Sequence, residues 1–212
     1  MALIYGELNV DVPNLPPTEI EHFISDTKEF HELSIYSKEE KVYFQRNNRD
    51  YPWDRRVLEF NGKEFYNYKS LNPFKKIKNL IESLPIIKES RYVTLLYQRE
   101  QSKYDFNFHF DNDDPCGFRI CFNLDINKIF LEIASLKHEF MDLPNGSKIE
   151  NNMVKEEIYD VIPKKTNTIF CIAGKKYPHR VPVNNSFQRV SIIVKGKITT
   201  LEDLNFLTKI EE

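Results

Sequence analysis

The stretch FNFHFDND, residues 106–113, places side chains with metal-binding chemistry at regular spacing. Polar and apolar residues alternate there as they do in a β-strand, so His109 and Asp111 share one face, opposite three phenylalanines. An imidazole nitrogen and a carboxylate oxygen together suit a borderline divalent metal ion. The alternative is that this polar face simply points to water, since His-x-Asp alone is a weak motif.

A third ligand is expected from a distant part of the chain, because two ligands are too few to hold the ion. His179, in KKYPHRVPV, stands at the start of a later predicted strand. Two histidines and one carboxylate form the facial triad of non-haem iron(II), which leaves positions open for a cosubstrate and dioxygen. His179 taken alone is more often a structural histidine, so the interpretation depends on the whole set of residues.

Arg189 and Ser191 supply the chemistry that a dicarboxylate cosubstrate needs at its far end. Arg189 follows His179 by ten residues, and Ser191 lies two positions further on the same predicted strand. A guanidinium group binds a carboxylate through two parallel hydrogen bonds, and the serine hydroxyl adds a further contact.

Short strands must position these residues. Apolar residues at helical spacing predict helices over 18–30 and 72–85, and residues 41–46 are predicted to form a short strand. Eight extended segments with turns between them then occupy the chain from residue 91 to residue 196. Residues 199–210 could form a last helix. This pattern predicts a mainly β fold with flanking helices and a jelly-roll core. We expect a single domain over 1–212, with a mixed helix and strand part over 1–90, a core over 91–195 with an insertion near 134–155, and a tail or helix over 196–212.

Composition and charge narrow the class of protein further. The net charge of −2 and the pI near 6.3 give no electrostatic reason to expect nucleic acid as a partner. Three cysteines without paired spacing argue against a disulfide framework. The chain shows no secretory leader and no long apolar run, so we expect a cytoplasmic protein that does not enter a membrane. The oligomeric state stays open.

The segments HFD, PHRV and QRVS resemble the signature of the iron(II)- and 2-oxoglutarate-dependent oxygenases with a double-stranded β-helix core. Within that superfamily, GFRICFNLDINKIFLEI and TIFCIAGKKYPHRVPVNNSFQRVSIIVKG are similar to the aspartyl/asparaginyl β-hydroxylase-like group, which includes hydroxylases of free amino acids such as proline. The likeness covers about residues 91–195. Some animal members of the group lack the carboxylate ligand, whereas Asp111 is present here.

The resemblance implies His109, Asp111 and His179 as iron ligands and Arg189 as the anchor of the 2-oxoglutarate distal carboxylate, assisted by Ser191. It implies a dioxygenase that uses Fe(II), 2-oxoglutarate and O2 to hydroxylate an unactivated C–H bond, with release of succinate and CO2. The expected substrate is an amino acid, free or in a peptide.

Two further residues have open roles. Arg119 matches an arginine that the group uses near its active site, where it would meet a substrate carboxylate or hold the cosubstrate; a surface salt bridge is the alternative. The Tyr97 hydroxyl would reach 2-oxoglutarate, or its ring would simply pack in the core. For the whole protein, a non-oxidative, metal-binding cupin-like protein and a purely structural β-sandwich are the competing hypotheses.

Overall fold

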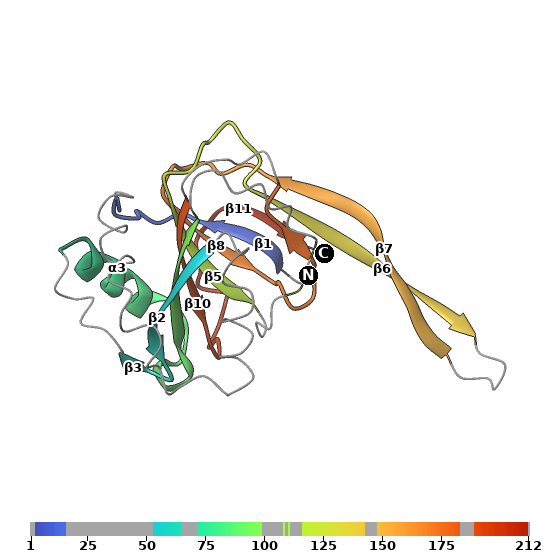
Figure 1. Ribbon diagram of the computed structural model, residues 1–212, viewed down its shortest axis with the longest axis horizontal. Helices are drawn as coiled ribbons and strands as arrows, with labels where there is room; N and C mark the ends of the chain where they lie inside the picture. Colours follow the sequence, from blue (N-terminus) through green and yellow to red (C-terminus); the bar gives the residue numbers. More distant parts are fainter. Residues whose placement is uncertain are drawn as a thin grey trace.

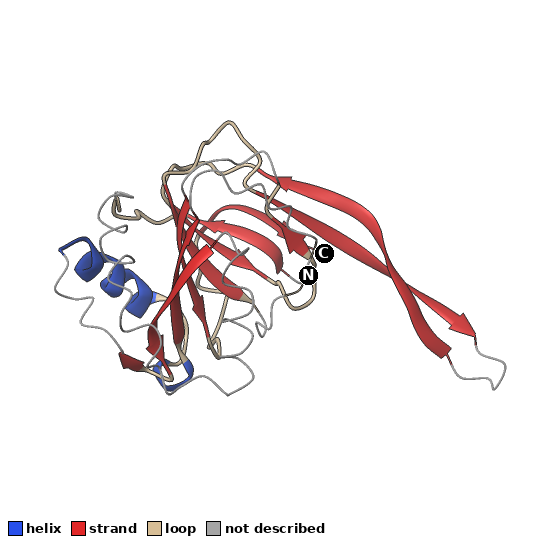
Figure 2. Cartoon of the chain, viewed as in Figure 1, coloured by secondary structure: helices blue, strands red, loops and turns tan. Residues whose placement is uncertain are grey.

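The computed structural model describes residues 3–15, 53–64, 72–98, 108, 110, 116–142, 148–182 and 189–211. Strands form most of this part of the chain, and one α-helix lies against one side of it (Figures 1 and 2). No helix in these ranges is long and apolar enough to span a membrane. The elements are β1 (Leu3–Leu8), β2 (Trp53–Phe60), β3 (Lys63–Glu64), α3 (Asn72–Ser83), the short 3-10 helix η3 (Lys88–Ser90), β4 (Tyr92–Gln98), β5 (Gly117–Phe122), β6 (Leu131–Asp142), β7 (Lys148–Val161), β8 (Thr168–Ile172), β9 (His179–Arg180), β10 (Arg189–Lys195) and β11 (Phe206–Glu211).

The strands form two antiparallel sheets. The larger has eight strands in the order β11-β1-β8-β5-β10-β4-β2-β3, and the smaller has three in the order β7-β6-β9. The chain passes repeatedly between them, since β5, β8 and β10 belong to the large sheet while β6, β7 and β9 belong to the small one. Alternation of this kind is the topology of a jelly roll, or double-stranded β-helix. The predicted fold class is therefore confirmed.

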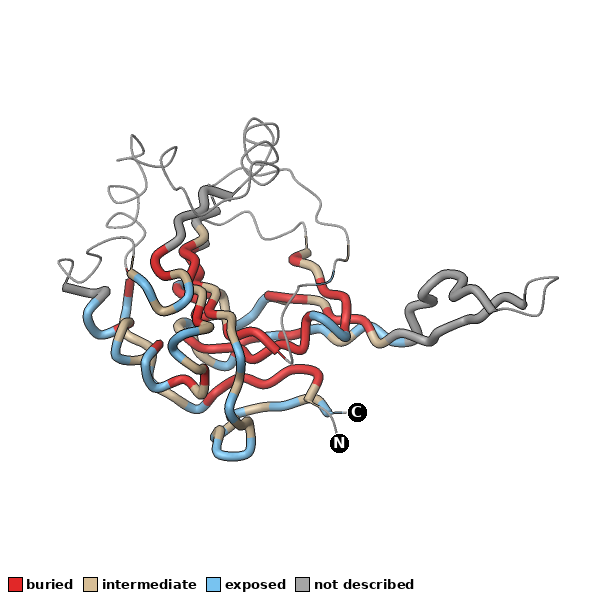
Figure 3. Tube along the Cα trace, turned by 90° about the horizontal axis from the view of Figure 1, so that it is seen from below, coloured by how far each residue is buried: buried red, intermediate tan, exposed pale blue. Residues whose placement is uncertain are grey.

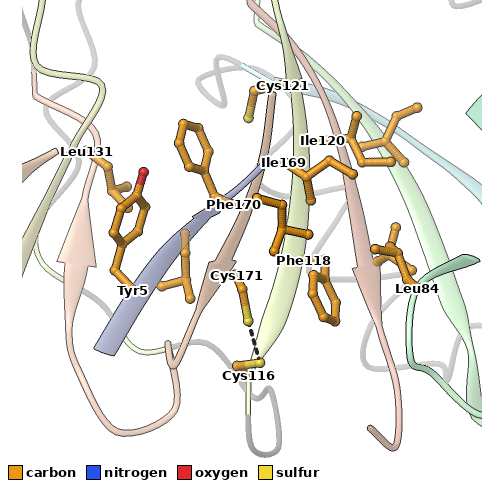
Figure 4. Packing of buried hydrophobic residues seen from close by; sticks show 14 of the residues in the cluster. Tyr5, Leu84, Cys116, Phe118, Ile120, Cys121, Leu131, Ile169, Phe170 and Cys171 are labelled. Atoms are coloured by element: carbon orange, nitrogen blue, oxygen red, sulfur yellow. Dashed lines mark hydrogen bonds between the residues drawn. The ribbon is translucent and has the colours of Figure 1, made fainter. Parts of the chain in front are cut away.

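Both faces of the large sheet are covered. In β5, Phe118 and Ile120 alternate with Arg119 and Cys121, so the two pairs lie on opposite faces. Figure 4 shows Leu84, which follows α3, on the Phe118 side. On the other side, Phe170 stacks on Phe130 with ring centroids 4.8 Å apart. Figure 3 shows the buried residues gathered in the middle of the molecule, with exposed residues toward the outside.

Helix α3 forms where the sequence predicts it. Ile77 and Ile81 have no exposed surface and, with Leu84, continue one stripe at helical spacing.

A buried ion pair joins β2 to the residue before β4. The carboxylate of Glu59 accepts two hydrogen bonds from Arg91, at 2.8 and 3.1 Å, and both side chains are buried. This paired arrangement is what allows two charges to lie inside the protein.

Residues 134–155, which interrupt the sequence pattern of short strands, belong mostly to the long hairpin of β6 and β7. The pairing runs from Leu131 opposite Val161 to Asp142 opposite Lys148. Only the base of β6 also pairs with β9, at Glu132 and Ile133. Figure 1 shows the rest of the hairpin extending away from the large sheet.

For residues 196–212 the sequence predicts a tail or a helix, and the helix is wrong at residues 206–211, which form strand β11 instead. Its residues alternate between half-buried and exposed, and it pairs antiparallel with β1. The two ends of the chain consequently lie near each other (Figure 1). Pairing with β1, which would otherwise form the edge of the large sheet, determines the extended conformation of this segment. The helix predicted at 18–30 and the strand predicted at 41–46 lie outside the described residues.

Candidate functional site

The structure describes the predicted site residues to different extents. The side chains of His179, Ser191 and Arg119 are described. His109 and Asp111 lie outside the described residues, and for Arg189 and Tyr97 only the strand positions are described. Among the described residues, no three His, Cys, Asp or Glu side chains gather in a metal-binding cluster.

His179 lies in the interior between the two sheets. It begins β9, pairs with Ile133 of β6, and has no exposed surface. Its Nδ1 faces the carbonyl oxygen of Tyr177 at 3.4 Å, and its Nε2 lies 2.9 Å from Nη2 of Arg119. A guanidinium group only donates hydrogen bonds, so Nε2 must accept and Nδ1 must carry the proton. The ring is thus a neutral imidazole whose Nε2 lone pair points into the interior.

Arg119 reaches His179 from the opposite sheet. In β5 it pairs with Phe170 of β8 on one side and with Ile193 of β10 on the other. Residues directly opposite each other in antiparallel strands share a face, so these three side chains line the inner face of the large sheet. The alternative of a surface salt bridge for Arg119 does not describe this arrangement, because its guanidinium is directed across the interior to a buried imidazole.

Ser191 belongs to the same inner face. It pairs with Cys121 of β5, and the pair of Ile193 with Arg119 lies two positions away along the same strands. Ser191 is only 5% exposed. The structure therefore brings Ser191, Arg119 and His179 to one interior, while their roles in a common site remain a prediction.

The backbone register fixes the positions of Arg189 and Tyr97. Arg189 begins β10 opposite Gln98, whereas Tyr97 pairs with Val190. Arg189 therefore lies two positions before Ser191 in β10, whereas Tyr97 lies opposite Val190, the residue between them. The predicted roles of these two side chains remain predictions.

Arg180 lies on the outer face of the small sheet, because neighbouring residues of a strand point to opposite faces and His179 points inward. Its guanidinium forms an ion pair with Glu132 and lies 4.7 Å from the centre of the Phe108 ring. Phe110 is 40% exposed. The roles of Arg180 and of the Tyr177 carbonyl were not predicted from the sequence. The alternation of a strand around His179 could have indicated that Arg180 faces outward. No sequence signal indicates that the Tyr177 carbonyl accepts a hydrogen bond from His179.

A second buried polar group lies on the same inner face of the large sheet, because Glu7 pairs with Phe170 and Phe170 pairs with Arg119. The carboxylate of Glu7, which has no exposed surface, accepts hydrogen bonds from the backbone N–H of Lys164 and from the hydroxyl of Thr168. Nearby, burial raises the pKa of the Tyr5 hydroxyl, and the charges of Glu7 and Cys121 raise it further. The two hydrogen bonds to Glu7 hold the segment before β8 in place.

Three comparisons with known proteins were made, with family models, with curated proteins and with solved structures. No protein-family model matches the chain, and no curated protein matches it. Several solved structures are distantly similar to it. A C-terminally truncated protein of Neurospora crassa in its apo form has 15% identity and a TM-score of 0.41, over 90% of this chain and 80% of that one. A protein of Shewanella oneidensis, with a provisional description as an oxygenase, has 11% identity and a TM-score of 0.45, over 93% and 83%.

A third match is TqaL, described as an Fe(II)/α-ketoglutarate-dependent dioxygenase, with 12% identity and a TM-score of 0.34 over 90% of this chain and 92% of that one. Because these identities and TM-scores are all low, the fold assignment rests on the strand order and pairing given above.

Proposed function

We propose that this protein is an Fe(II)- and 2-oxoglutarate-dependent dioxygenase of the aspartyl/asparaginyl β-hydroxylase-like group. Its substrate would be an amino acid, free or in a peptide, hydroxylated at an unactivated C–H bond with release of succinate and CO2. The observation that carries this proposal is the buried imidazole of His179, which directs an acceptor nitrogen into the interior of a jelly roll. A neutral imidazole held in this tautomer is a good ligand for a divalent transition metal.

The described neighbours of residue 109 support a shared site for both histidines. The Phe108 ring lies against Arg180, on the face of the small sheet opposite His179, and Phe110 is partly exposed. The structure assigns no strand to Phe108 or Phe110. An extended backbone in this stretch, as the sequence predicts, would direct His109 and Asp111 to the other side, toward the interior. His109, Asp111 and His179 would then supply the two nitrogens and one carboxylate that iron(II) takes in oxygenases.

The cosubstrate would lie along β10. Ser191 is on the inner face, and Arg189 stands two positions earlier in the same strand. Strand alternation predicts that the Arg189 guanidinium faces the same side and binds the distal carboxylate of 2-oxoglutarate through paired hydrogen bonds. The Ser191 hydroxyl would donate one further hydrogen bond to that carboxylate.

The residues of the chain would position and shield the reactants, while bound iron(II) supplies the activation of dioxygen. The Tyr177 carbonyl keeps the proton of His179 on Nδ1, so that Nε2 stays available as a ligand atom. Arg119 now donates to that same Nε2, and it must withdraw when a metal ion binds there. A guanidinium released in this way would meet a carboxylate of the cosubstrate or substrate. Phe170 and Ile193, on either side of Arg119, make the surroundings apolar and exclude water.

Succinate formation tests the proposal. Purified protein would be incubated with Fe(II), 2-oxoglutarate and a panel of amino acids and peptides, and products with one added oxygen atom would be sought by mass spectrometry. We expect turnover in the wild type and none when both Asp111→Ala and His179→Ala are introduced. His138→Ala, in the β6–β7 hairpin, serves as the control histidine variant. Unchanged turnover in the double variant would contradict the proposal.

The same jelly-roll topology is found in cupins that bind metal or small ligands without oxidising them. This second candidate predicts metal binding without succinate formation and gives Arg189 no role in affinity for 2-oxoglutarate. Equilibrium binding of 2-oxoglutarate to the wild type and to Arg189→Met therefore separates the two.

A further inference from the structure

Two of the three cysteines are in direct contact. The Sγ atoms of Cys116 and Cys171 lie 2.8 Å apart, and the residues are 2% and 0% exposed (Figure 4). Both are thiols in this structure. A disulfide bond has a length of about 2.05 Å, so a shift of less than about 1 Å would bring the two sulfur atoms to bonding distance.

Strand pairing fixes this contact. Cys171 in β8 pairs with Phe118 in β5, and Cys116 precedes Phe118 by two positions. Residues separated by two positions share a face, so Cys116 is the diagonal neighbour of Cys171 across the two strands. The two cysteines are 55 positions apart in the chain, and the sequence gives no sign of their proximity.

The third cysteine, Cys121, cannot reach this pair because of the same strand geometry. Cys121 pairs with Thr168 in β8 and with Ser191 in β10. It is separated from Cys116 by an odd number of positions in an extended segment, so its side chain points to the opposite face of the sheet. Figure 4 shows it at a distance from the two contacting sulfur atoms. The chain thus contains one pair of cysteines that can react with each other and one that cannot join them.

We propose that Cys116 and Cys171 form a reversible intramolecular disulfide when hydrogen peroxide reaches them. The thiolate of one cysteine attacks a peroxide oxygen, the O–O bond breaks, and the departing hydroxide takes a proton to become water, which leaves a sulfenic acid. The second thiol then attacks that sulfur, the S–O bond breaks, and a second water leaves. Two thiols are oxidised by two electrons in total, and one peroxide is reduced to two waters. A dithiol reverses the reaction by thiol–disulfide exchange.

The surroundings favour this product over a metal complex. Both cysteines belong to the apolar core cluster that includes Phe118. A disulfide is neutral and leaves no charge in that core, whereas a metal would need two buried thiolates and further ligands. The described part of the chain offers no third His, Cys, Asp or Glu for such a cluster.

The cross-link would connect the residue just before β5, five positions after Asp111, with β8, the strand that precedes His179. This connection to the metal site rests on the proposed function, whereas the chemistry of the two thiols does not. The test below accordingly uses neither iron nor catalytic turnover, so that its failure and a failure of the oxygenase proposal are distinguishable.

Thiol counting with peptide mapping provides the test. The full-length protein would be reduced, freed of reductant, treated with hydrogen peroxide while folded, and then denatured for titration of thiols. We expect the count to fall from three to one, with one linked peptide pair that contains Cys116 and Cys171, and to return to three after treatment with a dithiol. Cys121→Ser should form the same link, whereas Cys116→Ser and Cys171→Ser should not.

Three results would overturn the proposal: three thiols that remain free, a link that contains Cys121 or joins two molecules, or oxidation of each thiol to a sulfinic or sulfonic acid without a link. Measurement of the wild type alone distinguishes these results, so the conclusion does not depend on how well the serine variants fold.

Discussion

Replacement of Arg119 by methionine tests whether this side chain competes with a metal for His179. The guanidinium donates a hydrogen bond of 2.9 Å to Nε2, the nitrogen that a metal ion would need. Methionine keeps an unbranched apolar stem but has no charge and no donor. We therefore predict that Arg119→Met binds a divalent metal ion more tightly than the wild type when no cosubstrate is present.

The size of the effect follows from the contact that is lost. A hydrogen bond that involves a charged group contributes about 1.5–3 kcal/mol, and every 1.4 kcal/mol corresponds to a tenfold change in affinity. Removal of the competing guanidinium should therefore raise the affinity by roughly ten- to a hundredfold. The relief of repulsion between two cations acts in the same direction.

Titration with Co(II), followed by its visible absorption, measures this affinity directly. Arg180→Met is the matched control, because Arg180 is the next residue after His179 but contacts Glu132 and Phe108 instead of Nε2. Its affinity should equal that of the wild type. An affinity in Arg119→Met that is unchanged or lower would refute the assignment of Nε2 as the ligand atom.

Further predictions concern the imidazole and the buried groups around it. Long-range 1H–15N NMR of the metal-free protein should show His179 protonated on Nδ1, and a proton on Nε2 would contradict the tautomer assigned here. Glu59→Gln leaves Arg91 as a buried charge without its partner and should lower the free energy of unfolding by about 3–5 kcal/mol, measured by urea denaturation; a loss below about 1 kcal/mol would show that the pair is dispensable. Because the pKa of Tyr5 is raised in the folded protein, its contribution to stability is complete below about pH 10 and declines above it, by about 1.4 kcal/mol per pH unit. The difference in stability between the wild type and Tyr5→Phe should change with that slope, and a difference independent of pH would exclude this explanation.

Local periodicity was sufficient to predict several elements of the fold. The stripe of Ile77 and Ile81 predicted α3, and the extended segments around residues 117–122 and 168–172 predicted strands of the core. These patterns are reliable because each element must bury one face or both, and burial leaves a period in the sequence.

Contacts between segments that are distant in the chain leave no periodic pattern in the sequence. The pairing of β11 with β1 depends on an open sheet edge at the other end of the chain, so the local sequence of residues 206–211 suggested a helix instead. The contact of Cys116 with Cys171 likewise arises only after β5 and β8 have paired. For the candidate site, residue types indicated His179 and Ser191, and a family resemblance indicated Arg119. The hydrogen bond of Arg119 to Nε2 required the two sheets to be in place.

Anaerobic binding of Fe(II) and 2-oxoglutarate tests the central claim most directly, namely that His179 contributes to an iron centre that binds an oxo-diacid. We predict a weak visible absorption band when both are added to the wild type, and no such band with His179→Gln. An iron-loaded wild type without this band, or a variant with a band of equal strength, would contradict the account.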